Sequence, residues 1–183
     1  GSIPSPSFTF AASAEVVVLA GASPVFVDID PDTYNMSPDS LSAAIEAVKA
    51  KGELTPKAVI AVDLFGQPAD YPALEPIARE HGLKLVSDCA QAYGSTLGGK
   101  ASLNWADALT VSFYPAKPLG AYGDAGAVLC KDGVVRCLNP DGKSWSIAFD
   151  HLGGPVLVKG EMPKKAVPAA ASVKASDAAV ACG

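Results

Sequence analysis

Three polar side chains stand at the ends of short apolar runs, and a lysine follows the last of them closely. Asp63 follows one run, Asp88 and Ser112 end two others, and Lys117 lies five residues beyond Ser112 in a loop with two prolines. In an open parallel sheet, ligands bind at the carboxyl ends of the strands, so these residues should share one edge. The spacing therefore predicts a carboxylate, a hydroxyl and an amine close together.

Each of these residues also has an ordinary structural explanation. An Asp at a strand end often caps the next helix or turn, and a Ser there is more often structural than catalytic. A single Lys in a loop rich in Pro and Gly is usually a solvated surface residue. Taken singly, none of them identifies a site, so the prediction needs a longer pattern.

The apolar runs are the strands that would position these residues. Each is short and rich in Val, Ile, Leu or Ala, which is typical of a strand covered on both faces of a parallel sheet. The predicted strands are residues 24–28, 57–62, 84–88 and 108–112. A further run at 126–130 follows after only 13 residues, which include two prolines and two glycines and are too irregular for a crossover helix. We therefore expect this strand to run antiparallel to its neighbour.

Helix signals separate the runs. Ser37 can cap a helix whose apolar residues recur at helical spacing until Gly52, and Asp70 can cap another that stops at Gly82. An earlier helix is predicted over residues 11–20. The order of strands and helices predicts βαβ units. The expected fold class is α/β, with a mostly parallel sheet, one antiparallel strand and helices on both faces.

Composition limits the classes of function. The 183 residues are 49% hydrophobic and 18% charged, with a net charge of −5. Scattered charges with a negative balance give no electrostatic reason to expect nucleic acid or an anionic membrane as partner. Four cysteines without a Cys-x-x-Cys pair indicate free thiols in a reducing compartment, and no apolar stretch is long enough to span a membrane. We therefore expect a soluble cytoplasmic protein.

The regular alternation of strands and helices ends near Lys131. Residues 132–163 are rich in turn signals, with room for a hairpin or two, and are predicted to form an irregular extension. The composition of residues 164–183 is dominated by Ala, Val, Ser, Lys and Pro, which predicts a disordered tail. The sequence thus divides into residues 1–131, 132–163 and 164–183.

Longer strings extend the site pattern over residues 3–130. Asp-Cys-Ala-Gln-Ala-Tyr-Gly at 88–94 is followed by Ser-Phe-Tyr-Pro-Ala-Lys-Pro-Leu-Gly at 112–120, and others lie at 6–10, 21–28, 63–70 and 123–127. In this order they resemble the DegT/DnrJ/EryC1/StrS family of sugar-nucleotide aminotransferases, fold-type-I enzymes that use pyridoxal 5'-phosphate (PLP). The resemblance implies that residues 1–131 are part of a PLP-binding large domain.

The resemblance also implies roles for single residues. Lys117 matches the lysine that is covalently joined to the cofactor, and Asp88 matches the carboxylate that faces the pyridine nitrogen. Gln91 matches the side chain near the phenolic oxygen, Ser112 a hydroxyl that contacts the phosphate, and Phe10 the aromatic residue that stacks on the ring.

For function, the resemblance implies amino transfer from glutamate to a nucleotide-linked keto-sugar. Complete family members form homodimers. Residues 6–39 and 115–126 are most similar to enzymes that aminate a UDP-linked 3-keto-N-acetylhexuronate for surface polysaccharide. Family members carry a phosphate-binding loop upstream and a smaller domain downstream, so we expect this chain to be truncated at both ends.

The sequence leaves other classes of protein to consider beside an aminotransferase. A non-catalytic remnant or interaction module of the same family is the alternative, because the truncated chain need not be active. A dehydrogenase-type nucleotide binder is not favoured, because no Gly-x-Gly-x-x-Gly follows a predicted strand. In related dehydratases His takes the position of Lys117, so the lysine favours transamination. No metal site is predicted.

Overall fold

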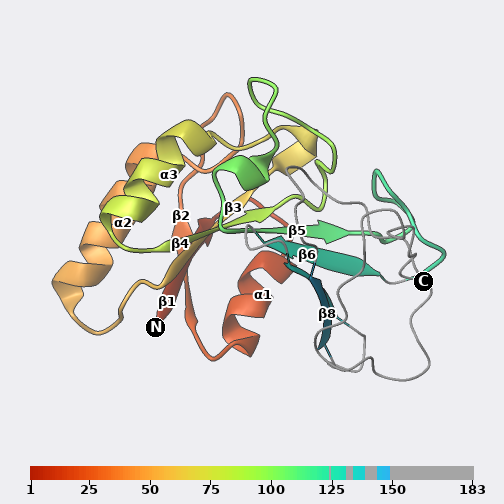
Figure 1. The fold of residues 1–183 in the computed structure, drawn as a ribbon. Coiled ribbons are helices and arrows are strands. Elements are labelled where there is room, and N and C mark those ends of the chain that lie inside the picture. The colour runs from red at the N-terminus through yellow and green to blue at the C-terminus, as the bar shows by residue number, and fades with distance from the viewer. Residues whose placement is uncertain (124, 131–133, 139–143, 149–183) are drawn as a thin grey trace.

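The strands and helices follow the predicted alternation closely (Figure 1). The computed structural model describes residues 1–123, 125–130, 134–138 and 144–148. Its elements are, in chain order, β1 Ser2–Pro6, α1 Ala12–Leu19, β2 Ser23–Val27, α2 Pro38–Lys51, β3 Ala58–Val62, a 3-10 helix Leu64–Gly66, α3 Tyr71–Glu80, β4 Lys84–Asp88, a 3-10 helix Ser102–Asn104, β5 Ala108–Ser112, β6 Gly126–Cys130, β7 Val134–Leu138 and β8 Ser144–Ala148.

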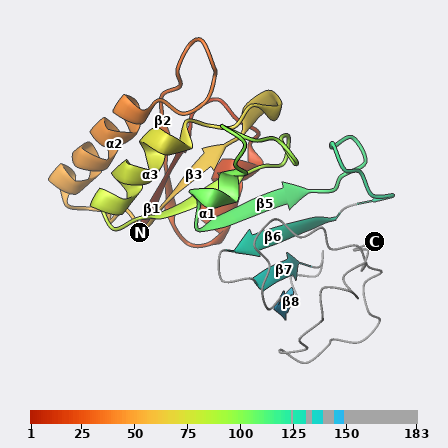
Figure 2. The same cartoon turned by 45° about the horizontal axis from the view of Figure 1, so that its top comes forward.

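Within the described residues, the main sheet has six strands in the order β3-β4-β5-β6-β7-β8. β3, β4 and β5 are parallel, and β6 runs antiparallel to β5, with Ser112 opposite Gly126. The predicted reversal of this strand is confirmed. β7 and β8 continue the sheet as an antiparallel hairpin inside the region 132–163, as the view of Figure 2 shows. Residues 149–163 and the predicted tail 164–183 lie outside the described residues.

β1 pairs in parallel with β2 and was not predicted. Ser2 exchanges backbone hydrogen bonds with the segment just before β3, whereas Ser7 donates to Val27 of β2. Backbone groups of successive residues point to opposite sides of a strand, so Pro4 and Pro6 lie on the same side as Ser2 and offer β3 no N–H. The two prolines therefore separate a two-stranded sheet from the six-stranded one, although β1 lies beside β3.

Helices lie on both faces, as expected for this fold class. α2 and α3 pack on one face, and α1 lies on the other (Figures 1 and 2). The predicted caps are present, because the side chains of Ser37 and Asp70 accept backbone N–H groups from Ser40 and Ala73, both at 3.3 Å. No helix in the described part of the chain is long and apolar enough to cross a membrane.

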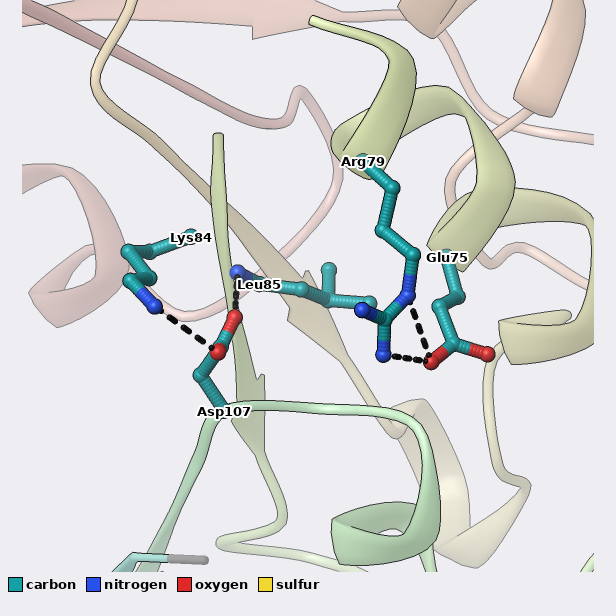
Figure 3. A network of polar contacts seen from close by, with 5 residues as sticks. All are labelled: Glu75, Arg79, Lys84, Leu85 and Asp107. Atoms are coloured by element: carbon teal, nitrogen blue, oxygen red, sulfur yellow. Dashed lines mark hydrogen bonds and ion pairs between the residues drawn. The ribbon is translucent and has the colours of Figure 1, made fainter. Parts of the chain in front are cut away.

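The amino ends of β4 and β5 are held together on the side of the sheet away from the predicted site. Asp107, just before β5, accepts the backbone N–H of Leu85 at 2.9 Å and pairs with the ammonium group of Lys84 at 3.1 Å (Figure 3). Glu75 and Arg79 form an ion pair one turn apart on α3 in the same view. Buried apolar residues of β3, β4, α2 and α3 fill the core beside these contacts. The carboxyl ends of β3, β4 and β5 therefore point together to the opposite edge, where the polar residues lie.

Candidate active site

All five predicted site residues line one cavity at that edge. The cavity has a volume of about 680 Å³, and Phe10, Asp88, Gln91, Ser112 and Lys117 are among its lining residues. Apolar or small side chains complete the wall, including Ala12, Val62, Leu64, Ala90 and Val111. A largely apolar cavity of this size with a few convergent polar groups has the usual form of a small-molecule site.

Asp88 is held by a short hydrogen-bonded chain from α1. The buried hydroxyl of Ser13 donates to Asp88 Oδ2 at 3.1 Å, and the hydroxyls of Ser13 and Thr9 lie 3.2 Å apart. The backbone N–H of Ala90 donates to the other carboxylate oxygen at 3.2 Å. These contacts fix how the carboxylate is rotated at the end of β4. Sequence patterns gave no sign of Ser13 or Thr9.

Gln91 is oriented by the loop that follows β3. Its Oε1 accepts the backbone N–H of Phe65 at 2.7 Å. A backbone N–H can only donate, so the amide oxygen must face Phe65 and the amide NH₂ must face elsewhere. Gln91 can therefore donate to an acceptor in the cavity that it lines.

The Lys117 loop is closed by its own backbone. Lys117 N donates to Tyr114 O at 2.8 Å, and at the neck of the loop Ala121 N donates to Phe113 O at 2.7 Å. Pro115 occupies the second position of this turn, where its fixed φ is favourable. A Cβ on Gly120 would lie 2.5 Å from the carbonyl oxygen of Pro115, so only glycine fits there. The half-buried Lys117 is thus presented from a compact loop.

Phe10 and Ser112 complete the predicted set. Phe10 is 73% exposed although it lines the cavity, so its ring is accessible to a ligand there. Ser112 Oγ accepts the backbone N–H of Tyr114 at 3.3 Å, and its own hydroxyl hydrogen can still be donated.

Asp63 lies at the same edge of the sheet, but its carboxylate is bound by other protein groups and does not face the cavity. Its backbone N–H donates to Asp88 O at 2.9 Å, yet its carboxylate is buried outside the cavity lining. The carboxylate accepts Tyr71 Oη at 2.6 Å, Ser102 Oγ at 2.7 Å, Ala69 N at 3.0 Å and Ser87 Oγ at 3.3 Å. Burial raises the pKa of the Asp63 carboxyl, and these hydrogen bonds oppose the rise. Of the three strand-end residues, Asp63 is therefore the one that acts as a structural anchor.

Comparisons with known proteins agree with this arrangement. Residues 3–138 match the model of the DegT/DnrJ/EryC1/StrS aminotransferase family. Over 129 residues the chain is 47% identical to the UDP-2-acetamido-2-deoxy-3-oxo-D-glucuronate aminotransferase of Pseudomonas aeruginosa, a match that covers 69% of this chain and 33% of that protein. The chain spans about a third of the length of the curated relatives it matches.

Solved structures show the same likeness. A DegT DnrJ EryC1 StrS aminotransferase from Brucella abortus is 50% identical, with a TM-score of 0.70, and the match covers 72% of this chain and 35% of that one. NtdA from Bacillus subtilis, solved with bound cofactor PMP, is 32% identical, with a TM-score of 0.61 and coverage of 70% and 27%. Since the family model covers most of the sequence and the strands around the cavity follow the expected order, the chain belongs to the DegT/DnrJ/EryC1/StrS aminotransferase family.

Proposed function

We propose that this chain carries the cofactor-binding part of a PLP-dependent aminotransferase. In this proposal the amino group moves from glutamate to the keto carbon of a nucleotide-linked sugar, and the sugar is a UDP-linked 3-keto-N-acetylhexuronate. The observation that carries the proposal is that Lys117 and Asp88 line the same cavity as Phe10, Gln91 and Ser112.

The donor set fits the cofactor. PLP is a flat ring with a basic nitrogen, an anionic oxygen, an aldehyde and a phosphate, and each has a counterpart in the lining. Asp88 supplies an anion for the nitrogen, the NH₂ group of Gln91 a donor for the oxygen, and Lys117 an amine for the aldehyde. Ser112 supplies a hydroxyl for the phosphate, and the ring of Phe10 can stack on the flat face.

Asp88 would hold a proton on the pyridine nitrogen. When bound, PLP supplies a sink for the electron pair left on carbon as a C–H bond breaks, and a protonated ring is the better sink. A carboxylate about 3 Å from the nitrogen would stabilise the proton by roughly 5–6 kcal/mol at an effective dielectric near 20. One pKa unit corresponds to only about 1.4 kcal/mol. The charge of Asp88 is therefore large enough to keep the nitrogen protonated near neutral pH, whereas a neutral Asn would not be.

Lys117 would have two tasks. As a neutral amine, its Nζ would hold the cofactor covalently. Once the amino donor has displaced it, the released Nζ can take the proton from one carbon and return it to another. An arginine could do neither, because its guanidinium stays protonated. The hydrogen-bonded backbone of residues 113–121 supports both tasks by presenting the amine at the cavity.

Further parts of the proposal rest on the relatives. The sugar nucleotide is proposed because the Pseudomonas aeruginosa relative is named for a UDP-linked 3-oxo-glucuronate. Glutamate as donor, a homodimer as the assembly and the cytoplasm as the compartment are proposed from the family resemblance. A homodimer is consistent with the open, aromatic mouth of the cavity, where Phe10 and Tyr114 are exposed.

Covalent trapping tests the proposal directly. PLP is added to the purified 183-residue chain, the mixture is reduced with borohydride, and the modified lysine is located by peptide mass spectrometry. We expect one adduct per chain, at Lys117, and its loss in Lys117→Arg and Lys117→Ala. Lys100→Ala is the matched control, because Lys100 also lies exposed in a glycine-rich loop but outside the cavity. Incubation of the unreduced adduct with glutamate should then release 2-oxoglutarate.

Two results would speak against the proposal. An adduct spread over Lys100 and other surface lysines as much as Lys117 would show nonspecific chemistry. A folded chain that forms no adduct would favour the alternative, a non-catalytic member of the family. Far-UV circular dichroism of each sample separates these results from simple misfolding.

A further inference from the structure

Two aromatic residues have a backbone conformation that aromatic residues rarely adopt. Tyr34 has φ 60° and Phe65 has φ 56°, and they are the two residues other than glycine with positive φ in the part of the chain that the structure describes. A bulky side chain in this region is strained, and such strain persists where the surrounding structure enforces it, often at ligand sites. Here the two strained residues touch each other.

Their rings form a cluster with Phe8, which we name the aromatic platform. The ring centroids lie 6.4 Å apart for Tyr34 and Phe65, 5.6 Å for Phe8 and Tyr34, and 6.4 Å for Phe8 and Phe65. All three rings are exposed, and Phe65 is 70% exposed. The strain therefore does not serve to bury these rings, since it presents them to solvent.

Buried hydrogen bonds hold the two strained loops in place. The side chain of Asn35, next to Tyr34, is buried and donates to Gln67 O at 3.1 Å and Pro68 O at 3.2 Å. Its Oδ1 accepts the backbone N–H of Leu64 at 3.2 Å. A single side chain thus ties the loop of Tyr34 to the loop of Phe65. The two loops that carry the platform are therefore joined by buried hydrogen bonds.

The platform continues the rim of the candidate active site. Thr9 follows Phe8 and lines the cavity, and Leu64 precedes Phe65 and also lines it. The backbone N–H of Phe65 is the group that orients Gln91, at 2.7 Å. A ligand that fills the cavity and extends over this side of its mouth would meet the three rings.

We propose that the aromatic platform binds the base of the sugar nucleotide, an inference that rests on the proposed function. Bases stack on aromatic side chains because both carry flat π surfaces. The loop that carries Tyr34 also bears the carboxylates of Asp28, Asp30 and Asp32. Backbone N–H groups of Thr33 and Asp32 lower the pKa of Asp30, so it stays anionic. These charges repel phosphate, which leaves the neutral base as the part of the nucleotide that fits here.

Glycine variants give a clean test. Glycine adopts positive φ without strain, so Phe65→Gly and Tyr34→Gly remove a ring while keeping the loop conformation available. Phe26→Ala is the matched control, because Phe26 is 61% exposed but lies on β2 outside the platform. The probe is UDP, measured by saturation-transfer NMR on the uracil protons and by a titration of affinity. We expect at least a tenfold weaker Kd in each glycine variant and less than a twofold change in Phe26→Ala.

Each outcome decides the inference, and the Lys117 adduct is measured in the same samples. Unchanged UDP affinity in both glycine variants, with the adduct intact, overturns the platform and leaves the proposed function standing. A chain that binds UDP through the rings but forms no adduct overturns the proposed function and keeps the platform. Absence of UDP binding at millimolar concentration overturns the platform. So does a dimer that the glycine variants dissociate without loss of UDP affinity, because the rings would then be a contact between copies.

Discussion

At the scale of single residues, the site depends on side chains that touch no ligand in our proposal. Ser13 brings a hydroxyl from α1 to Asp88 across 75 positions of sequence. A carboxylate whose oxygens accept directed hydrogen bonds loses rotational freedom, which fixes the orientation of Asp88 at the cavity. Ser13 is thus a positioning residue for Asp88.

Removing the Ser13 hydroxyl should weaken both the fold and the cofactor site. Ser13→Ala should lower the free energy of unfolding by about 1 kcal/mol, the usual net value of one hydrogen bond. PLP affinity should fall by about fivefold for the same reason. Ser13→Thr keeps a hydroxyl and should retain most of both quantities. Urea unfolding and a PLP titration measure the two effects, and equal behaviour of the Ala and Thr variants would argue against a positioning role.

The Cys89 thiol gives a pH-dependent prediction. Burial, reinforced by the charge of Asp63, raises the pKa of Cys89 to about 12. The folded protein then keeps this proton when the unfolded chain has lost it. The free energy of unfolding should therefore decrease as pH rises from about 9 toward 12. Iodoacetamide should label Cys89 at pH 8.5 about 100-fold more slowly in the native chain than in urea.

Peptide mapping identifies which thiol has reacted, and Cys89→Ala should flatten the alkaline decrease in stability. Burial also raises the pKa of Tyr71 and Tyr93, so their titration destabilises the fold in the same direction. Equal labelling rates in the native and unfolded chain would contradict the burial of this thiol.

The candidate site itself was largely readable from sequence, but its supports were not. Asp88, Ser112 and Lys117 come at or just beyond strand ends, and strand ends leave a local signature of apolar runs. The contacts of Ser13 with Asp88 and of Asn35 with the Phe65 loop join residues remote in sequence, and no local pattern encodes them. The roles of the five site residues stay predictions until the adduct is mapped.

At the scale of elements, the loop of residues 113–121 decides where the amine lies. Gly120→Ala would place a methyl group against the Pro115 carbonyl, and the loop would have to open. We expect the rate of adduct formation at Lys117 to fall at least about tenfold, since small displacements of a reacting group cost this much. Stability should fall by about 1–2 kcal/mol, because opening the loop would break the hydrogen bonds that close it.

Gly123→Ala is the control for this prediction. A Cβ at position 123 has no neighbour within 4 Å, so the same chemical change should leave the rate of adduct formation nearly unchanged. The rate is followed by absorbance after mixing with PLP. If both variants slowed equally, glycine flexibility rather than the close approach to Pro115 would be responsible.

The elements show why most of the fold, but not β1, was predictable. β4, β5 and β6 have the predicted bounds, because each is an apolar run flanked by turn residues. The caps at Ser37 and Asp70 mark α2 and α3. β1 contains Ser2, Pro4 and Pro6, and two prolines are a pattern that argues against a central strand. β1 can still pair with β2, because the residues between the prolines point their N–H groups toward β2. Propensity scales do not record on which side of a strand the N–H groups are needed.

At the scale of the whole molecule, the buried Asp63 carboxylate joins elements that are distant in sequence. It accepts from Tyr71 on α3, Ser87 on β4, and Ser102 at the start of a 3-10 helix. Burial raises the pKa of Asp63, because the charged form of the carboxyl is costly to bury. The contribution of Asp63 to the free energy of unfolding is therefore greatest at low pH, where the carboxyl is protonated, and decreases as pH rises through the folded-state pKa. The donors around it offset that cost.

Truncating this carboxylate should therefore affect the entire fold. Asp63→Ala would leave several buried donors without an acceptor and should lower the free energy of unfolding by about 3 kcal/mol or more. Tyr71→Phe removes one donor and leaves the others satisfied, so we expect a loss of about 1 kcal/mol. Urea unfolding followed by far-UV circular dichroism compares the two. Similar losses for both variants would mean that the carboxylate is not the centre of the network.

The outer surface of α1 leads to a prediction about association. Val16, Val18 and Leu19 are exposed on this helix while Val17 is buried, so α1 is apolar on nearly every side. A helix that is apolar all round is normally covered, and a contiguous exposed patch of this kind promotes association. We expect the 183-residue chain to self-associate through α1 as its concentration rises.

Replacing two of these residues should suppress that association. Lys has a higher helix propensity than Val and one similar to Leu, so Val18→Lys with Leu19→Lys should preserve α1 while covering it with charge. Adding two positive charges also brings the net charge of −5 closer to zero, which by itself favours association. Ala47→Lys with Ala50→Lys makes the same change in charge at exposed positions of α2. Sedimentation velocity over a concentration series should therefore show clearly weaker self-association for the α1 pair than for the α2 pair. If the two pairs sediment alike, the contact lies elsewhere on the molecule.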